Sequence, residues 1–233
     1  MIMREIRVFP MSDGRAVEFA AQILKSKGVH VSKMLDASVT HVLLDVPTKE
    51  AAFSEIPAGV TVIGGNLDAL VHPSKVDLLR EEQYLSENAA ITADCALRLL
   101  GDRLPVAFRG CPILIIGWGR IGKCLASMLK ALDADVSVAA RKPSDLGMLT
   151  ALGYGAVAME HICPTQYRAI VNTAPAQVLG DGEEICVKID LASKLGMMGE
   201  NVLWARGLPG KMLPEESGAC IARGVLRHLE EVK

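Results

Sequence analysis

The fold of this chain is decided by the segment Cys111-Pro-Ile-Leu-Ile-Ile-Gly-Trp-Gly-Arg-Ile-Gly122. Residues up to Ile116 are almost wholly apolar, which is typical of a parallel strand that helices bury on both faces. A Gly-x-Gly-x-x-Gly loop follows, and apolar residues at helical spacing then continue as far as Leu132. A glycine loop between a buried strand and a helix is the arrangement that binds a dinucleotide. We therefore predict a Rossmann-type dinucleotide-binding domain.

Each glycine of this loop has a mechanical role in dinucleotide binding. Gly117 permits the tight turn, and Gly119 lets the backbone approach the pyrophosphate, which rests on the amino terminus of the helix. Gly122 allows the helix to pack closely against the strand. A strand–helix turn that needs glycine for its geometry alone is the alternative. The predicted cofactor loop comprises Gly117, Trp118, Gly119, Arg120, Ile121 and Gly122.

The end of the second strand of this domain distinguishes NADP from NAD. NAD-binding domains place Asp or Glu there, where it accepts a hydrogen bond from the 2′-hydroxyl of the ribose. The predicted strand over 135–140 ends instead in Arg141-Lys142-Pro143-Ser144. A guanidinium binds a 2′-phosphate bidentately and a hydroxyl donates to it, so Arg141, Lys142 and Ser144 favour NADP over NAD. The alternatives are a solvated basic turn, or recognition by Asp145 if the strand ends later.

Polar clusters follow three further predicted strands, which cover 169–172, 187–190 and 202–204. They read Asn172-Thr-Ala-Pro175, Asp190-Leu-Ala-Ser193 and Arg206-Gly-Leu-Pro-Gly-Lys211. Ligands of open α/β sheets bind beyond the carboxyl ends of the strands. The residues that we expect to border the nicotinamide are Asn172, Thr173, Ala174, Pro175, Asp190 and Gly207, and the alternative is ordinary turn chemistry. Helices are predicted over 144–153, capped by Ser144, and over 215–231.

The first third of the chain alternates short strands with helical stretches. Strands are predicted over 5–9, 29–31, 41–46 and 60–63, and a helix over 15–27, while 77–84 reads as a helix or as a loop. This alternation predicts a parallel sheet. The fold class is therefore α/β, a Rossmann-type doubly wound parallel sheet with a second, smaller flavodoxin-like N-terminal domain. The predicted boundaries are 1–86 for this substrate-side domain, 87–103 for a linker helix, 104–214 for the Rossmann domain, and 215–233 for a helix that returns toward the linker and the N-terminal domain.

Composition excludes several classes of protein. A net charge of −2 gives no electrostatic footprint for nucleic acid and no polybasic stretch for a membrane surface. No apolar run approaches the ~20 residues that span a bilayer, and no secretory signal is seen, so we expect a cytoplasmic protein without a membrane partner. The six cysteines form no Cys-x-x-Cys pair and the histidines are scattered, which predicts free, mostly buried thiols and no metal site.

The catalytic residues are harder to identify. The 2-hydroxy-acid dehydrogenases, whose Gly-x-Gly-Arg-Ile-Gly loop is similar, place a histidine after the last strand of the cofactor domain to act as a general base. Here that region reads Trp204-Ala-Arg-Gly-Leu-Pro-Gly-Lys211, without histidine, and His161 stands alone in a predicted loop. This absence weakens the hypothesis of a hydroxy-acid dehydrogenase.

The cofactor half resembles the A subunit of bacterial dipicolinate synthase, the enzyme of endospore formation. The likeness covers about residues 88–230, and its Ala-Ala-Arg-Lys and Gly-Leu-Pro-Gly combinations are more specific than the glycine loop alone. Asn88 with Thr92-Ala93-Asp94 is similar to the family's Asn…Pro-Thr-x-Glu-Gly stretch. The other similar segments are Gly117–Gly122, Leu129–Lys142, Val171–Pro175, Ile189–Lys194 and Gly207–Lys211.

The resemblance implies an NADP-dependent oxidoreductase that oxidises a dihydrodipicolinate-type dicarboxylate to dipicolinate by hydride transfer. It also implies a partner, a flavoprotein-like B subunit, and we expect homo-oligomers. A dicarboxylate needs cations and N–H donors, and aromatising a dihydropyridine makes a strong dedicated base less necessary. The candidate catalytic residues are Thr92, Asp94, Lys194, Arg206 and Lys211.

This chain departs from the family pattern on the substrate side. Its N-terminal domain is shorter, Pro-Thr-x-Glu-Gly has become Ile91-Thr-Ala-Asp-Cys95, and a Pro-Gly-Gly stretch is replaced by Leu195-Gly-Met197. Two alternatives therefore stay open beside the synthase: a nucleotide-binding accessory or regulatory subunit without catalysis of its own, and a relative of the D-2-hydroxy-acid dehydrogenases.

Overall fold

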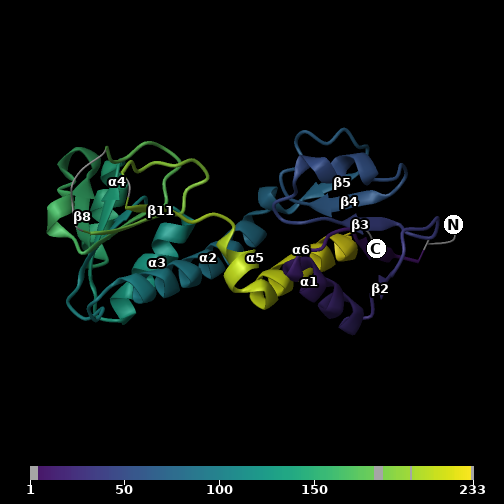
Figure 1. Cartoon of the computed structure of the whole chain (residues 1–233), viewed down its shortest axis with the longest axis horizontal. Helices are drawn as coiled ribbons and strands as arrows, with labels where there is room; N and C mark the ends of the chain where they lie inside the picture. The colour runs from purple at the N-terminus through teal and green to yellow at the C-terminus, as the bar shows by residue number, and fades with distance from the viewer. Residues whose placement is uncertain (1–4, 181–185, 200, 232–233) are drawn as a thin grey trace. The chain divides into compact units, whose positions relative to one another are not determined.

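The computed structural model describes residues 5–180, 186–199 and 201–231. The chain divides into two compact units (Figure 1). Unit 1 comprises Met1–Ile91 and Pro209–Lys233, and unit 2 comprises Thr92–Leu208. Each unit is built around its own parallel sheet, so the two are described separately below.

Within the described residues, the sheet of unit 1 has five strands, all of them parallel, in the order β2-β1-β3-β4-β5. This is the flavodoxin-like order, and it confirms the predicted fold class of the N-terminal half. Because β1 lies between β2 and β3, the direction of strand addition reverses at the β1/β3 boundary. The strands are β1 (Arg7–Pro10), β2 (His30–Val31), β3 (His41–Leu43), β4 (Thr61–Gly64) and β5 (Lys75–Asp77).

Helices α1 (Arg15–Ser26) and α6 (Pro214–Glu231) pack together in unit 1, although they come from opposite ends of the chain (Figure 1). Their contact is close, because a Cβ at Gly218 would stand 2.6 Å from the carbonyl oxygen of Ala16. Apolar residues of both helices share one core cluster with β1, β3 and β4. A second cluster joins β3 and β4 to the 3-10 helix η1 (Glu50–Glu55). The sheet is thus buried on both faces, as parallel strands require.

In unit 2, the described residues form six parallel strands in the order β11-β10-β9-β6-β7-β8. Read from the other edge, this is the Rossmann order 3-2-1-4-5-6, which confirms the doubly wound domain. The glycine-loop strand β6 occupies the centre of the sheet, where Ile113, Leu114, Ile115 and Ile116 are fully buried. The strands are β6 (Pro112–Ile116), β7 (Asp135–Ala140), β8 (Gly155–Ala158), β9 (Ala169–Asn172), β10 (Val187–Asp190) and β11 (Val202–Trp204).

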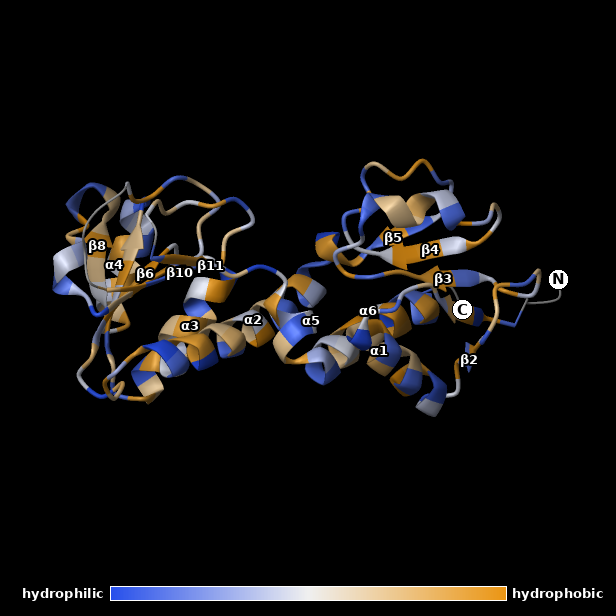
Figure 2. Cartoon of the chain, viewed as in Figure 1, coloured by the Kyte–Doolittle hydropathy of each residue, from blue (hydrophilic) through white to orange (hydrophobic). Residues whose placement is uncertain are grey.

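The helices around this sheet are α3 (Arg120–Ala131), α4 (Pro143–Ala151) and the 3-10 helices η3 (Met159–His161) and η4 (Pro164–Gln166). The chain passes from one unit to the other twice. The first boundary lies within helix α2 (Glu82–Arg103), and the second lies within α5 (Leu208–Met212). Figure 2 shows hydrophobic colouring along β3, β4 and β6, while α1 and α6 alternate between hydrophobic and hydrophilic residues. Among the described residues, no helix is both long enough and apolar enough to cross a membrane.

The predicted strands of unit 2 agree closely with the structure, and several other details of the chain differ. Strand β5 was not predicted, because a three-residue edge strand is too short to show alternation, and the 3-10 helix η2 (Leu78–Arg80) occupies part of the stretch over 77–84 that was read as a helix or a loop. Helix α2 begins at Glu82, five residues before the predicted start, and the predicted strand over 41–46 already ends at Leu43. The segment after Gly207 forms α5 rather than a turn.

The predicted cap of α4 is wrong. Lys142 has the extended backbone of the N-cap, Pro143 occupies the first turn, and no side chain caps the helix. Proline suits this position because its fixed φ matches the helix and its missing N–H needs no partner there. Ser144 therefore lies inside the first turn of α4, one residue beyond Pro143.

Candidate functional site

The glycine loop joins the end of β6 to the start of α3. Gly117 has φ of +106°, which L side chains rarely adopt, and its N–H donates to the carbonyl of Ala139 at 2.9 Å. A Cβ at Gly122 would stand 2.1 Å from the carbonyl oxygen of Gly117, so only glycine lets α3 approach the loop this closely. Gly119, by contrast, is exposed, and apart from its chain neighbours no atom of the described residues lies within 4 Å of where its Cβ would stand. The loop thus combines two sterically required glycines with one that leaves open space above it.

The residue after β9 fastens this loop to the neighbouring strand. The Thr173 hydroxyl donates to the carbonyl of Ile116 at 3.0 Å and lies 3.4 Å from that of Gly117. The Thr173 backbone N–H also donates to Ile116, at 2.9 Å. A Cβ at Gly117 would stand 2.6 Å from the Thr173 hydroxyl, so a side chain at position 117 would displace this hydroxyl.

Asn172 and Asp190, at the ends of β9 and β10, form a fully buried polar network. The Asn172 side-chain amide donates to both carboxylate oxygens of Asp190, at 3.1 Å each, and to the carbonyl of Ala174 at 3.0 Å. Its own carbonyl accepts from the N–H of Ala174 at 2.9 Å. The network therefore fixes the first turn of the loop that follows β9.

The Asp190 carboxylate also accepts from the backbone N–H groups of Ala192 (2.9 Å), Gly196 (2.7 Å) and Met197 (3.1 Å). Its hydrogen-bonding capacity is thus directed at the protein itself. Gly196 completes this arrangement, because a Cβ there would stand 2.2 Å from the carbonyl oxygen of Ala176. Sequence reasoning missed this role of Gly196; the signal available was a glycine soon after the strand-ending Asp190.

The basic residues expected to read the 2′-phosphate lie directly after β7. This strand ends at Ala140, so Arg141 stands at its tip, as the sequence predicted, and Arg141, Lys142 and Ser144 are all exposed. The tip adjoins the glycine loop through the backbone, since Ala139 accepts the Gly117 N–H. Asp145 lies farther on, in the first turn of α4.

Trp118, within the loop, directs its ring to the protein rather than to open solvent. Its ring centroid lies 5.7 Å from that of Tyr154 in an edge-on arrangement. The ammonium of Lys123 lies 5.8 Å from the Trp118 ring, and that of Lys130 lies 4.7 Å from the Tyr154 ring. Two lysines of α3 thus lie near the Trp118–Tyr154 ring pair beside the loop.

The candidate catalytic residues fall in different surroundings. Thr92 is buried on α2, and Asp94 on the same helix lies 3.9 Å from Arg98 across one turn. Lys194 is exposed in the loop after β10. These three belong to unit 2.

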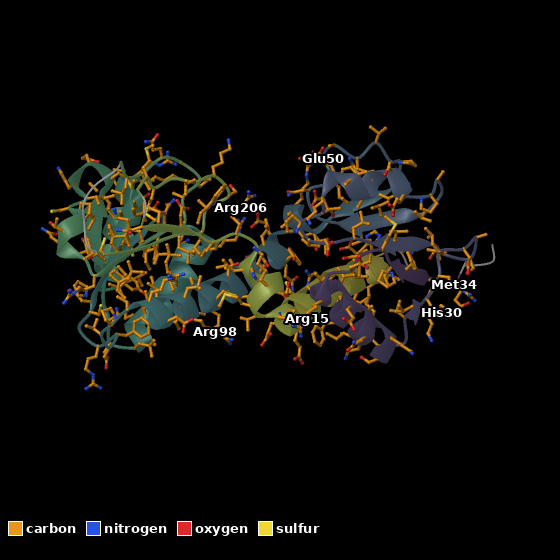
Figure 3. The ribbon with its side chains drawn as sticks, in the orientation of Figure 1. Arg15, His30, Met34, Glu50, Arg98 and Arg206 are labelled. Atoms are coloured by element: carbon orange, nitrogen blue, oxygen red, sulfur yellow. The ribbon has the colours of Figure 1, made fainter. Side chains whose placement is uncertain are left out.

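Arg206 and Lys211 are both exposed but belong to different units. The guanidinium of Arg206, which is labelled in Figure 3, lies 5.1 Å from the ring of Trp204. The indole N–H of Trp204 donates in turn to the carbonyl of Ala192 at 3.0 Å. Trp204 thereby joins the Asp190 loop to Arg206, a link that the sequence did not indicate. Within unit 2, the site therefore brings together the glycine loop, the ends of β9 and β10, and this tryptophan.

The cysteines are free, as predicted. Cys95, Cys111, Cys186 and Cys220 are buried, whereas Cys124 is half-buried and Cys163 exposed. Burial raises the pKa of the Cys220 thiol to about 12 and also raises the pKa of Cys111. Both thiols stay protonated at neutral pH, which makes them poor nucleophiles.

Comparison with known proteins identifies relatives of this chain. No protein-family model matches it. The A subunit of dipicolinate synthase from Bacillus subtilis (strain 168) is 24% identical over 213 residues, which cover 81% of this chain and 71% of that protein. The resemblance inferred from the motifs is therefore confirmed by an independent sequence match.

Solved structures give the same result for the fold. The crystal structure of the A subunit of dipicolinate synthase from Bacillus halodurans superposes with a TM-score of 0.82 at 20% identity, over 98% of this chain and 99% of that one. A transhydrogenase from Sinorhizobium meliloti superposes with a TM-score of 0.70 at 16% identity, over 97% and 94% of the two chains. The chain thus has the two-sheet α/β fold of these two proteins.

Proposed function

We propose that this protein is an NADP-dependent oxidoreductase that oxidises a dihydrodipicolinate-type dicarboxylate to dipicolinate by hydride transfer. The observation that carries the proposal is the intact glycine loop, held by Thr173 beside a basic strand tip, in a chain similar to the A subunit of dipicolinate synthase. The fold supports a nicotinamide cofactor, since the solved structures that it resembles include a transhydrogenase. The choice of NADP over NAD rests on the residues after β7.

The residues of the loop fit a dinucleotide. The pyrophosphate requires a close approach to the backbone at the start of a helix, and the exposed Gly119 leaves that space open at the start of α3. Arg141 and Lys142 offer cations for a 2′-phosphate, with Ser144 nearby in the chain. The turn over 172–175, together with Gly207, provides backbone groups for the nicotinamide end. The bound cofactor supplies a hydride acceptor.

The protein's own contribution is to bind and orient a doubly negative substrate. Lys194 and Arg206 are exposed cations on unit 2, after β10 and β11. We assign Asp190 and Thr92 an indirect role, because Asp190 is saturated by protein donors and Thr92 is buried. The proposal needs no histidine base, since aromatisation of a dihydropyridine favours loss of the ring proton.

Further parts of the proposal concern the assembly. The relative is named as one subunit of a synthase, which suggests a partner. We take this partner to be a flavoprotein-like B subunit, and we propose that the chain also forms homo-oligomers. We propose a cytoplasmic location and keep the predicted division into substrate-side domain, linker helix, Rossmann domain and C-terminal helix.

The test is hydride transfer by the purified chain. NADP and a dihydrodipicolinate mixture are added with and without a B-type subunit, while absorbance is followed at about 340 nm, where reduced nicotinamide absorbs. The proposal predicts a rise that depends on both substrates. Tight NADPH binding without turnover would instead favour an accessory role, whereas activity on 2-hydroxy acids would favour a relative of those dehydrogenases.

A further inference from the structure

The end of β10 contains a buried charge that the proposed function does not use. The Asp190 side chain is fully buried, and its hydrogen-bond donors are the side-chain amide of Asn172 and the backbone N–H groups of Ala192, Gly196 and Met197. Because every one of these partners is a donor, the side chain is a carboxylate; a carboxylic acid would carry an O–H without an acceptor among them. The end of β10 therefore carries a negative charge.

This carboxylate has no cation beside it. Among the described residues, none of the ion pairs includes Asp190. Lys188, the buried lysine on the same strand, is not one of its partners. Lys194 follows in the next loop but is exposed, so water and salt screen its charge. Because buried charges in proteins are usually paired with an opposite charge, Asp190 suits a counter-ion that arrives with a ligand.

The loops that follow β9 and β10 close over Asp190. The N–H of Gly196 donates to the carboxylate at 2.7 Å, and the carbonyl of Gly196 accepts from the N–H of Val178 at 2.7 Å. The indole N–H of Trp204 donates to the carbonyl of Ala192 and so joins the loop after β10 to the end of β11. Since these loops keep solvent from the carboxylate, its charge is screened much less than that of a surface group.

The strand order places Asp190 on the nicotinamide side of the proposed cofactor site. In the unit 2 sheet, β7 lies on one side of the glycine-loop strand β6, while β9 and then β10 lie on the other. A dinucleotide lies across such a switch point, with one nucleotide over each half of the sheet. Arg141, after β7, is our candidate for the 2′-phosphate of the adenosine half. The nicotinamide half therefore belongs over the ends of β9 and β10, in the unit that contains Asp190.

We propose that Asp190 makes unit 2 bind oxidised NADP more tightly than NADPH. This inference rests on the proposed function and adds to it a residue that determines which redox form is bound. The oxidised nicotinamide ring carries one positive charge, and it loses that charge when it accepts a hydride. The rest of the cofactor is the same in both forms, so the field of Asp190 attracts only the oxidised ring. Asp190 acts through this field, because the protein fills its hydrogen-bonding capacity.

This preference agrees with the direction of the proposed reaction. Once the hydride has been transferred, the ring is neutral and the attraction to Asp190 ends, which favours release of NADPH. The same attraction makes the bound cofactor a weaker oxidant, because a charge that stabilises the oxidised form opposes its reduction. Aromatisation of the dihydropyridine offsets this effect, since the stability of the aromatic product drives the hydride transfer.

The test measures, by calorimetry, the affinities of oxidised NADP, NADPH and 2′-phospho-ADP-ribose, which lacks the nicotinamide. In Asp190→Asn, the ratio of the affinity for oxidised NADP to that for NADPH should fall about tenfold, the order of magnitude for the attraction between a buried and a bound unit charge. Affinity for 2′-phospho-ADP-ribose should stay unchanged. The ratio also cancels any loss of folded protein, because both forms of the cofactor meet the same population.

Three further variants separate charge from shape. Asp190→Ser is a second neutral variant, in case the Asn amide prevents folding by facing the N–H groups of the loop. Asp190→Glu keeps the charge, so the wild-type ratio should persist there even if both affinities fall. Asp135→Asn removes an exposed carboxylate at the start of β7 in the same unit and should change none of the three affinities.

The outcomes distinguish this inference from the function on which it rests. If the wild type binds both forms of the cofactor and the neutral variants keep its ratio, the inference is wrong and the proposed function stands. If the neutral variants lose affinity for both forms equally, Asp190 only shapes the loops, and the inference is also wrong. A ratio that falls as far in Asp190→Glu as in the neutral variants would overturn it too. If the wild type binds neither form, the proposed function fails and the inference fails with it.

Discussion

The carboxyl edges of the two sheets use the same kinds of residue in different ways. In unit 2, Asp190 accepts from three backbone N–H groups and from Asn172, and Thr173 is engaged with the glycine loop. In unit 1, Asp45 accepts from Ser12 alone among the described residues, although Asp77, at the end of β5, is saturated by backbone N–H groups. In unit 2 the polar side chains at the edge hydrogen-bond to the backbone and fix its loops. In unit 1 the carboxylate of Asp45 keeps an oxygen that accepts no hydrogen bond from the described residues.

This difference separates two uses of polar side chains at the edge of a sheet. A dinucleotide is bound through backbone N–H groups and a helix terminus, so the side chains around it serve to fix the main chain. A reacting ring needs side-chain groups that exchange protons, and these must keep capacity that the fold does not consume. The edge of the unit 2 sheet thus has the features of a backbone surface, and the edge of the unit 1 sheet does not.

The largest effect should come from Gly122→Ala, which tests the rigidity of the unit 2 edge. The new Cβ would stand 2.1 Å from a backbone oxygen, so we expect a loss of stability of about 3 kcal/mol or more, together with loss of NADPH binding. Urea unfolding followed by tryptophan fluorescence reports on this unit, because both tryptophans, Trp118 and Trp204, lie in it.

The matched control is Gly147→Ala, a helical glycine of the same unit with nothing within 4 Å of its Cβ position. It should stabilise the unit by about 0.5–1 kcal/mol, since alanine is the better helix former. Equal losses in the two variants would contradict the close packing of α3 on the loop.

A smaller effect is expected at the end of β7, where Arg141 should contribute to the binding of NADPH but not of NADH. Arg141→Ala should weaken NADPH binding by about 1–3 kcal/mol, the range for a hydrogen bond to a charged group, and leave NADH binding unchanged. Fluorescence titration of both cofactors measures the difference. Equal losses for both would mean that Arg141 does not recognise the 2′-phosphate.

The smallest expected effect is a loss of stability of unit 1 at acid pH. His41 is buried there, its Nδ1 lies 2.8 Å from the Thr40 hydroxyl, and its ring centroid lies 6.2 Å from that of His228. Burial, followed by the neighbouring His228, lowers the pKa of His41. The unfolded chain therefore binds a proton that the folded chain excludes, and stability falls as pH drops from about 6.5 through the lowered value.

His41→Asn, which keeps an acceptor beside Thr40, should flatten this decline in melting temperature followed by circular dichroism. His30→Asn is the control, since His30 is exposed in the same unit. A decline that His41→Asn leaves intact would place the acid sensitivity elsewhere.

The sequence predicted unit 2 better than unit 1 for a physical reason. Its central strand β6 is an apolar run that ends in a recognisable glycine loop, and β7 and β9 have the predicted bounds. In unit 1, β5 is three residues long, and its Asp77 looks like any polar loop residue. Short edge strands carry too few residues for a period to appear.

The site shows the same limit. The glycines and the strand-end polar residues could be read from the chain, because each follows a strand directly. The partners of Asp190 could not, since Gly196 and Met197 meet it only once the loop has folded. The pairing of Ser12 with Asp45 joins residues 33 positions apart and needs the strand order of the sheet, which the sequence leaves undetermined.

Whether the glycine loop holds the cofactor can be measured by titrating NADPH into the wild type and into Gly119→Ala. Gly119 has an extended backbone with negative φ and open space at its Cβ position, so alanine should leave the melting temperature unchanged. If the loop binds the pyrophosphate, the added methyl group occupies its place, and affinity should fall by at least about tenfold. Unchanged NADPH affinity in a fully folded Gly119→Ala protein would contradict the assignment of the cofactor to this loop.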